Sequence, residues 1–475
     1  MQKDFALATF LKGLFCLCFV GMFFWILGVH NVVFWLTVAA AGVLLAVSYG
    51  LDLPHFGKLL FVVALLLRVA AVWTLQSPIL SDFQTQLQAS EQFAAGDMSF
   101  QDTSYFQSWG YQTGLVIYQG LLLKIWDNVL ILKLANCLWG AATVWLIYAI
   151  AREFFQERAC RCAALCYTCF LFPLTFTAIP NNSIPSGFFL YLCLYFLVKE
   201  DFLKEHPLGR YALASLSLAL SNFFRPGTIV MLVAVAAYFL FEMVFQWEKR
   251  NLLHWGKCLA VFFFGYFLLT NLFSQAVILT GINSAGLKNN EPLWSVLVGL
   301  NYDSGGTYNP EWDAIYQRME EQGCTYEQAQ WSLILDRISI PPDKLSELAC
   351  SKIHTFWWGN PMGTTLGYLE PSPLYDTAVS IHHCSNWLSI LLCAGGSVVL
   401  FKSRRRNAKA YLVPFLIFAV FCAYLVVEVQ SRYAYVVQPA VFILSAGGFQ
   451  LLAGAFRLQK GIQACSLPKE GANGQ

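Results

Sequence analysis

The sequence is dominated by long apolar runs, of which "KLLFVVALLLRVAAVWTLQ" at 58–76 is the clearest. A helix that crosses a bilayer needs about 20 consecutive apolar residues. Charged residues make up only 12% of the chain, against about 25% in a soluble domain, so lipid must be its main solvent. We predict an all-α integral membrane protein with about twelve transmembrane helices, at 6–28, 31–49, 58–76, 128–150, 162–179, 184–198, 210–222, 227–246, 257–280, 386–401, 411–428 and 433–456.

The placement of Lys and Arg predicts how these spans are oriented, because cytoplasmic loops carry the excess of basic residues. With the N-terminus inside, nineteen of the thirty Lys and Arg residues fall on the cytoplasmic side. Both termini are then cytoplasmic. The apolar stretch 111–126 is predicted to be an interfacial or re-entrant helix at the outer face, since a crossing there would move the following Arg residues outside.

The short loops and the lack of a retention signal favour a multi-pass protein of a bacterial plasma membrane.

The predicted spans divide the chain into five parts. We predict an N-terminal transmembrane hairpin at 1–57, a transmembrane core at 58–280 with a first outer loop at 77–127, a large extracytoplasmic loop at 281–385, C-terminal transmembrane helices at 386–456 and a cytoplasmic tail at 457–475.

Composition also bears on function. The net charge of +2 argues against a nucleic-acid partner, since such proteins carry dense basic patches. Twelve spans would suit a transporter or lipid flippase, but these carry charged residues deep in several helices, and here only Arg68 lies deep. That residue costs about 2.5–3.5 kcal/mol at mid-bilayer, so it needs either an acidic partner or a water-filled cavity.

No cofactor is firmly implied by the sequence. His382 and His383 are adjacent but have no third metal ligand nearby. The four Cys residues between 160 and 169 fall on or beside a predicted span, where cysteine packs as a small hydrophobe. A divalent metal therefore has no ligand set that supports it.

Asp82 is the most conspicuous acidic residue near a predicted membrane surface. It lies in "SDF", just beyond the span 58–76, where the sequence turns abruptly polar. Ser81 or Asp82 could simply cap a helix that runs to Gly96, because both are common N-cap residues. The alternative is a catalytic carboxylate at the outer face, where an acceptor could meet a lipid-linked donor.

Two Arg residues at predicted outer helix ends could meet a phosphate. Arg225 lies in "NFFRPG", and Arg432 lies in "EVQSRYAY", with Glu428 one turn before it and Tyr433 directly after it. Arg residues at this level often anchor lipid phosphates. A guanidinium held in place by neighbours can instead grip a substrate phosphate with two parallel hydrogen bonds.

The outer loop 281–385 supplies further candidates for substrate binding. "VGLNYDSGGTYNPEWD" at 298–313 is rich in turn formers and aromatic rings, which suit sugar faces but equally suit an ordinary surface loop. We predict substrate contacts from Tyr302, Asp303 and Tyr308, together with Tyr433. Lys352 and His354 in "ACSKIHTFWWGN" are candidates for phosphate contacts.

Taken in order, these elements resemble the GT-C type polytopic membrane glycosyltransferases, the superfamily of protein mannosyltransferases and aminoarabinose transferase-like enzymes. The similarity covers most of the chain after residue 58. It includes the span with Arg68, "SDF", "FFRPG", the large outer loop and the late "EVQSRYAYVVQPAVFILSAGGF". The two spans before residue 58 are extra, and Asp82-Phe83 stands where many members have two acids.

This resemblance implies a GT-C fold and transfer of a sugar from a polyprenyl-phosphate donor to a hydroxyl group of a glycan, lipid or protein. Asp82 would be the general base, and Arg432, then Arg225, would stabilise the departing lipid phosphate. Such enzymes typically invert the anomeric centre. A related polymerase or ligase with a polyprenyl diphosphate donor is the remaining alternative.

Overall fold

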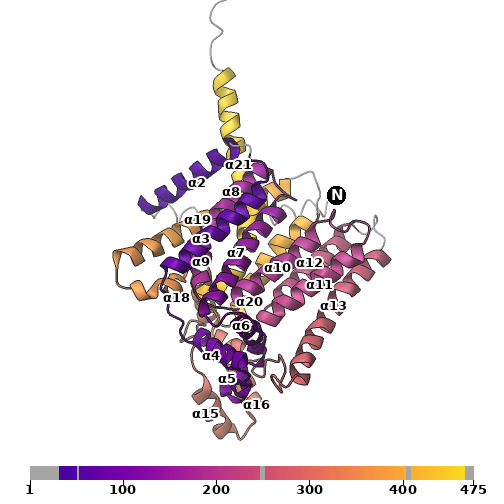
Figure 1. Ribbon diagram of the computed structural model, residues 1–475, viewed down its shortest axis with the longest axis vertical. Helices are drawn as coiled ribbons and strands as arrows, with labels where there is room; N and C mark the ends of the chain where they lie inside the picture. The colour runs from indigo at the N-terminus through magenta and orange to yellow at the C-terminus, as the bar shows by residue number, and fades with distance from the viewer. Residues whose placement is uncertain (1–31, 51–52, 247–251, 403–407, 466–475) are drawn as a thin grey trace, which may run out of the picture.

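The computed structural model describes residues 32–50, 53–246, 252–402 and 408–465. All regular elements within these residues are helices (Figure 1), which confirms the predicted all-α class. The predicted span 6–28 lies outside the described residues.

Most of the other predicted spans correspond to single helices. Their boundaries differ from the predicted ones by a few residues, except where a helix continues into a polar segment. These helices are α2 (Val32–Gly50), α3 (Phe56–Thr74), α7 (Val129–Ala151), α10 (Ser183–Val198), α11 (Pro207–Phe224), α12 (Ile229–Gln246), α13 (Leu252–Leu279), α19 (Pro373–Lys402), α20 (Leu412–Val426) and α21 (Gln438–Cys465).

The predicted number of twelve spans is not confirmed. Within the described residues, five helical segments are long and apolar enough to cross a membrane, namely Phe56–Thr74, Val129–Ala151, Trp255–Leu279, Pro373–Lys402 and Lys409–Val426. Helix α10 has 16 residues and is about 24 Å long, which is shorter than a hydrocarbon core of about 30 Å.

The span predicted at 162–179 is bent. Helix α8 (Glu157–Thr168) is followed by α9 (Leu171–Thr175) and the short helix η3 (Phe176–Ala178), at an angle of 56°. Pro173 lies just after the break, where its missing N–H prevents a continuous helical ladder. If this bent pair counts as one crossing, six candidates are present.

The two predicted outer loops form most of one end of the molecule. In Figure 1, α4, α5, α6, α15 and α16 gather at the bottom, below the long helices. Helix α19 begins at Pro373, so its first residues belong to the predicted loop segment 281–385. The loop elements are α4 (Asp82–Ala95), η1 (Ser99–Asp102), α5 (Ser104–Ser108), η2 (Gly110–Gln112) and α6 (Thr113–Ile125), then α14 (Trp294–Gly299), α15 (Trp312–Gln322), α16 (Tyr326–Ile338), α17 (Pro342–Trp358), α18 (Met362–Leu366) and η5 (Gly367–Leu369).

Helix α3 shows how a span that is apolar on all sides is oriented. Its buried residues recur every fourth position and include Arg68 in the same stripe, which is the spacing of one helix face. The opposite face is exposed and apolar, as expected of a surface in contact with lipid. The buried stripe is Phe56, Leu60, Ala64, Arg68 and Val72, and exposed side chains include Leu59, Val62, Leu66 and Trp73.

Close backbone packing joins α19 to α21. A Cβ atom added at Gly396 would lie 1.7 Å from the carbonyl oxygen of Leu444, and one at Gly448 would lie 2.3 Å from that of Leu392. Small residues allow helices to approach closely in membranes. The Gly pairs of "CAGGS" and "SAGGF" therefore fix the position of α21, and with it the segment that precedes α21.

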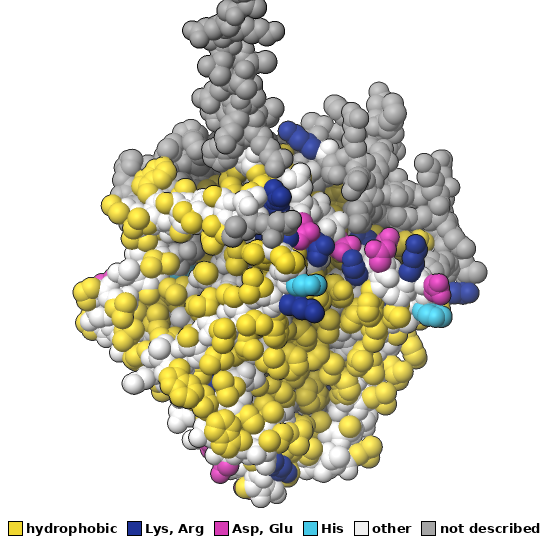
Figure 2. All heavy atoms as spheres, turned by 45° about the horizontal axis from the view of Figure 1, so that its top comes forward, with side chains coloured by type: hydrophobic (Ala, Val, Ile, Leu, Met, Phe, Trp, Pro, Cys, Tyr) yellow, Lys and Arg dark blue, Asp and Glu magenta, His cyan; other side chains and the backbone are white. Residues whose placement is uncertain are grey.

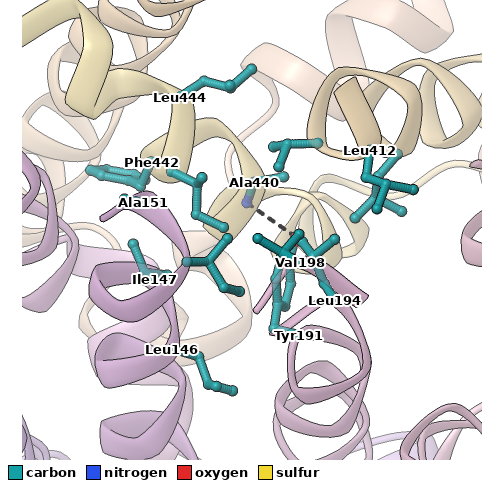
Figure 3. Packing of buried hydrophobic residues seen from close by; sticks show 14 of the residues in the cluster. Leu146, Ile147, Ala151, Tyr191, Leu194, Val198, Leu412, Ala440, Phe442 and Leu444 are labelled. Carbon is teal, nitrogen blue, oxygen red and sulfur yellow. Dashed lines mark hydrogen bonds between the residues drawn. The ribbon is translucent and has the colours of Figure 1, made fainter. Parts of the chain in front are cut away.

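That segment is η7 (Ser431–Val436), which carries Arg432. The hydroxyl of Tyr191 on α10 donates to the carbonyl of Val436 (2.8 Å) and accepts from the N–H of Ala440 (3.1 Å). Figure 3 shows the Tyr191 hydroxyl directed at Ala440, among apolar side chains of α7, α10 and α21. The Tyr191 hydroxyl thus holds the end of η7 and the start of α21 against α10.

Candidate functional site

Asp82 is the first residue of α4, at the end of the molecule where α5, α6, α15 and α16 also lie. Neither Ser81 nor Asp82 makes a side-chain hydrogen bond to the helix backbone, and Ser81 adopts φ 55°, ψ −135°. The helix does end at Gly96, in the left-handed conformation, as predicted. The capping explanation for Asp82 therefore finds no support, and its carboxylate is available for another role.

Arg432 faces this carboxylate from a distant part of the chain. Its Nη2 lies 3.8 Å from Oδ2 of Asp82, with the Arg432 side chain 19% exposed and that of Asp82 48% exposed. The guanidinium lies over two rings, 5.1 Å from the centroid of Phe83 and 5.7 Å from that of Tyr433. Because 3.8 Å is longer than a hydrogen bond, the two charges face each other without being locked together.

Arg225 joins the same cluster through Tyr433. It caps the C-terminus of α11, and its guanidinium lies 4.8 Å from the centroid of the Tyr433 ring. Its Nη1 donates to the hydroxyl of Ser183 at 2.6 Å. Two guanidiniums from segments far apart in the sequence thus lie over one aromatic ring.

Glu428 fixes Tyr433 in this position. Its Oε1 accepts from the Tyr433 hydroxyl (3.2 Å) and from Nε2 of Gln430 (2.6 Å). Burial raises the pKa of Glu428, and these hydrogen bonds and Arg432 act in the opposite direction. The backbone N–H of Glu428 also donates to the carbonyl of Ser295 (2.6 Å), in the segment between α13 and α19, so this residue ties that segment to the site.

Two tyrosines near Asp82 were not singled out from the sequence. Burial raises the pKa of Tyr105, with a further rise from Asp82, and the Tyr105 hydroxyl accepts from Nε2 of Gln86 at 3.0 Å. Burial raises the pKa of Tyr111 to about 12, whereas Arg225 lowers it. The aromatic cluster "SYFQSWGY" at 104–111 was a signal that could have pointed to both.

Other predicted site residues lie in the segment between α14 and α15. Tyr302 donates to Glu347 and has the ammonium of Lys344 5.3 Å from its ring centroid, while Asp303 and Tyr308 are exposed. Among the described residues, no hydrogen bond or ion pair connects these three predicted substrate contacts to Asp82 or to the two arginines. Their predicted role therefore rests on the sequence alone.

The two predicted phosphate ligands of α17 have different surroundings. Lys352 is 1% exposed, and its Nζ donates to the carbonyl of Gly299 at 2.6 Å. Burial lowers the pKa of Lys352 to about 8, while Glu428 acts to raise it. His354 is exposed and lies close enough to His383 to affect it electrostatically. Among the described residues, no hydrogen bond or ion pair connects Lys352 to Asp82 or to the two arginines.

Arg68 is fully buried near the middle of α3. Its Nη1 donates to the carbonyl of Ala64 at 3.1 Å, and its Nε has no hydrogen-bond partner. Among the described residues no acid forms an ion pair with it.

For metal binding, the part of the chain that the structure describes contains no group of three or more His, Cys, Asp or Glu side chains placed to hold an ion.

This arrangement can be compared with known proteins. Residues 118–269, from α6 to α13, match the family of dolichyl-phosphate-mannose-protein mannosyltransferases. That segment includes Arg225 but neither Asp82 nor Arg432. No curated protein sequence matches the chain.

Two solved structures are similar in fold to most of the chain. One is the archaeal oligosaccharyltransferase AglB from Archaeoglobus fulgidus in complex with an inhibitory peptide and a dolichol-phosphate, at 13% identity and a TM-score of 0.50, covering 88% of this chain and 53% of that one. The other is the oligosaccharyltransferase of the same organism tethered to an acceptor peptide with the NVT sequon, at 12% identity and a TM-score of 0.50, covering 86% and 51%.

The chain has the GT-C fold. The resemblance inferred from the order of its motifs is thereby confirmed. The chain spans about half the length of the solved structures that it matches. The similarity therefore concerns the fold, and the activity has to be argued from the site.

Proposed function

We propose that this GT-C chain is a glycosyltransferase that moves a hexose or pentose from a polyprenyl-phosphate donor to a hydroxyl group at the outer face of the membrane. The acceptor would be a cell-surface glycan, lipid or protein. The membrane would be a bacterial plasma membrane, with both termini in the cytoplasm. The observation that carries the proposal is the 3.8 Å approach of the Arg432 guanidinium to the Asp82 carboxylate.

In the proposed step, the acceptor oxygen attacks the anomeric carbon while its proton passes to the Asp82 carboxylate. The bond from the anomeric carbon to the phosphate oxygen breaks, and the polyprenyl phosphate leaves with the bonding electrons. A single displacement of this kind inverts the anomeric centre. Asp82 is suited to the role because its side chain is half-exposed and makes no capping hydrogen bond.

Arg432 and Arg225 would stabilise the phosphate as its negative charge grows. Fixed cations aimed at developing charge are an effective source of catalysis, and both guanidiniums are held by the Tyr433 ring. The dolichol-phosphate in the AglB structure supports a lipid phosphate as the group that this fold accommodates. No resident metal enters the proposed step.

The proposal is tested by supplying membranes that contain the protein with a polyprenyl-phosphate sugar labelled in the sugar. We expect label to leave the lipid with the wild type, and a loss of about 10²–10⁴-fold with Asp82→Asn, the range of a general base. Glu91→Gln is the matched control, because Glu91 is an exposed acid on the same helix α4.

Three outcomes would contradict the proposal. If the Asp82→Asn variant kept most of its activity, Asp82 would not be the general base. Label released only from a polyprenyl diphosphate donor would indicate a polymerase or ligase. Sugar that crosses the membrane while still attached to its lipid would indicate a transporter or flippase.

A further inference from the structure

A second polar site lies at the opposite end of α3 from Asp82. A cavity of about 630 Å³ is formed around the N-terminus of α3, the C-terminus of α7 and the start of α8. Helix α3 has 19 residues and is therefore about 28 Å long. Because Asp82 follows the other end of α3, this cavity is distinct from the candidate active site.

Cationic side chains predominate among the polar groups of the cavity. Lys58, Arg152 and Arg161 line it, with His55, and Glu157 is the acid among the lining residues. Glu157 lies 2.8 Å from Nη2 of Arg161 and 3.6 Å from Nη2 of Arg152. One carboxylate and three cationic side chains thus line the cavity, which leaves a positive excess.

Lys58 and Arg152 are the cations most accessible to a ligand. Lys58 is exposed, and no acid among the described residues forms an ion pair with it. The side chain of Arg152 is 48% exposed and is held over the ring of Tyr148, 5.2 Å from its centroid. A guanidinium positioned by a ring is well suited to bind phosphate oxygens.

The N-terminus of α3 adds backbone donors to this site. Phe56 and Gly57 line the cavity, and the preceding His55 provides no side-chain cap. The first N–H groups of a helix lack intrahelical partners and attract anions. Here this general property coincides with a cavity and with three cationic side chains, so the site is built from several independent groups.

The surroundings of the cavity are those of the lipid headgroup level. It lies at the N-terminus of the candidate span Phe56–Thr74 and at the C-terminus of the candidate span Val129–Ala151. The side chain of Trp145, which is 37% exposed, lines its wall. Aromatic rings of this kind are enriched at membrane interfaces. Below it, α3 presents exposed apolar side chains at Leu59, Val62 and Leu66. Figure 2 shows charged side chains gathered along one rim above a broad apolar surface.

We propose that this cavity binds the phosphate group of an anionic membrane lipid, with its acyl chains along the apolar face of α3. The phosphate lies between Lys58, Arg152 and the N-terminus of α3, and Arg161 contributes charge from deeper in the wall. Such a lipid clamps α3 to α7 and α8 at the end opposite the candidate active site. This inference is independent of the proposed transferase activity.

The test uses the purified, delipidated full-length protein and native mass spectrometry with added phosphatidylglycerol, phosphatidylcholine or inorganic phosphate. We expect phosphatidylglycerol to bind and to raise the unfolding temperature. The double variant Lys58→Gln/Arg152→Gln should bind it about 10–30-fold more weakly, as removal of two lipid-facing cations implies. The control Arg158→Gln/Lys204→Gln removes the same charge outside the cavity lining and should change binding less than about 3-fold.

Several results would overturn the proposal. Phosphatidylglycerol binding that is equal in the double variant, or equally reduced in the control, would exclude the cavity. Inorganic phosphate that binds and stabilises as well as phosphatidylglycerol at the same concentration would indicate a soluble anion instead of a lipid. If the double variant does not fold, Lys58→Gln alone replaces it, because that side chain is exposed and forms no ion pair with an acid of the described residues. Unchanged binding there would count against the site.

Discussion

The guanidinium of Arg432 lies over the ring of Phe83, 5.1 Å from its centroid. Phe83 directly follows Asp82, so the residue next to the proposed base positions the cation that faces it. A contact of this kind contributes about 0.5–1 kcal/mol at exposed sites and about 2 when desolvated. Because the Arg432 side chain is 19% exposed, the contact should contribute between these values.

Phe83→Leu should therefore weaken the positioning of Arg432 while it keeps the site apolar. We expect sugar transfer to fall about 3–10-fold, with little change in the unfolding temperature, because 1.4 kcal/mol corresponds to a factor of ten. The rate of label release from the lipid donor checks this. Phe83→Tyr retains the ring and should stay close to wild type; if Leu and Tyr behaved alike, the ring would have no role.

Arg432 itself should tolerate no substitution. Arg432→Gln removes the charge and should lower the transfer rate about 10²–10³-fold, the range seen when one group that stabilises developing charge is lost. Arg432→Lys keeps the charge but loses the planar guanidinium that stacks on Phe83 and Tyr433, so a loss of about 10-fold or more is expected. Single-turnover rates measure both variants.

The control for these two variants is Arg318→Lys, because Arg318 on α15 forms an ion pair with Asp336 on α16 (2.7 Å). It should transfer sugar at nearly the wild-type rate. A rate for Arg432→Gln within about 3-fold of wild type would show that the phosphate is stabilised by other groups.

Lys352 should make stability depend on pH. Burial lowers the pKa of Lys352 to about 8 in the folded protein, whereas an unfolded lysine titrates near about 10.4. Between these values the unfolded chain holds a proton that the folded chain has lost, so stability rises with pH, by up to about 1.4 kcal/mol per pH unit. Below pH 8 the cost of burying the charge is present in full.

Lys352→Met should remove this rise. The measurement is the free energy of unfolding of the full-length protein from pH 7.5 to 10.5, compared with wild type. Lys344→Met serves as the control, since Lys344 is an exposed lysine on the same helix α17, and it should keep the wild-type slope. Equal slopes for wild type and Lys352→Met would show that Lys352 titrates normally.

Gly140 on α7 makes room for Arg68 on α3. A Cβ atom at position 140 would lie 2.6 Å from Nε and 3.0 Å from Cδ of Arg68. Gly140→Ala should destabilise the protein by about 1–3 kcal/mol, the cost of overpacking a filled interior. In the Arg68→Leu background the same change should cost at least 1 kcal/mol less, because leucine lacks the Nε atom that the new Cβ would approach.

Unfolding temperatures of the four proteins in this cycle test the coupling. Gly42→Ala is the matched control, because no atom lies within 4 Å of a Cβ there, and a helical Gly→Ala change should be neutral or stabilising. Additive effects of Gly140→Ala and Arg68→Leu would mean that the two residues do not share the space.

Much of the fold was accessible from the sequence because apolar content and helix length are local properties. The helices near 58–76 and 128–150, and the one that starts at Asp82 and ends at Gly96, lie where they were predicted. The continuation of α19 back to Pro373 was missed because residues 373–385 are polar enough to suggest a loop. The break after α8 was missed because Pro173 lies within an otherwise apolar run.

The sequence by itself determined that the chain is a helical membrane protein, and which residues have the chemistry of a base and of phosphate ligands. The tertiary structure alone decided which of these meet. It places Arg432 and Arg225 on the Tyr433 ring, with Arg432 facing Asp82, and it directs Lys352 toward the carbonyl of Gly299 and Tyr302 toward Glu347. The physical reason is separation along the sequence. Apolar content and helix signals act over a few neighbouring residues, whereas these contacts join distant segments and depend on how α10, α11, α21 and the loop pack together.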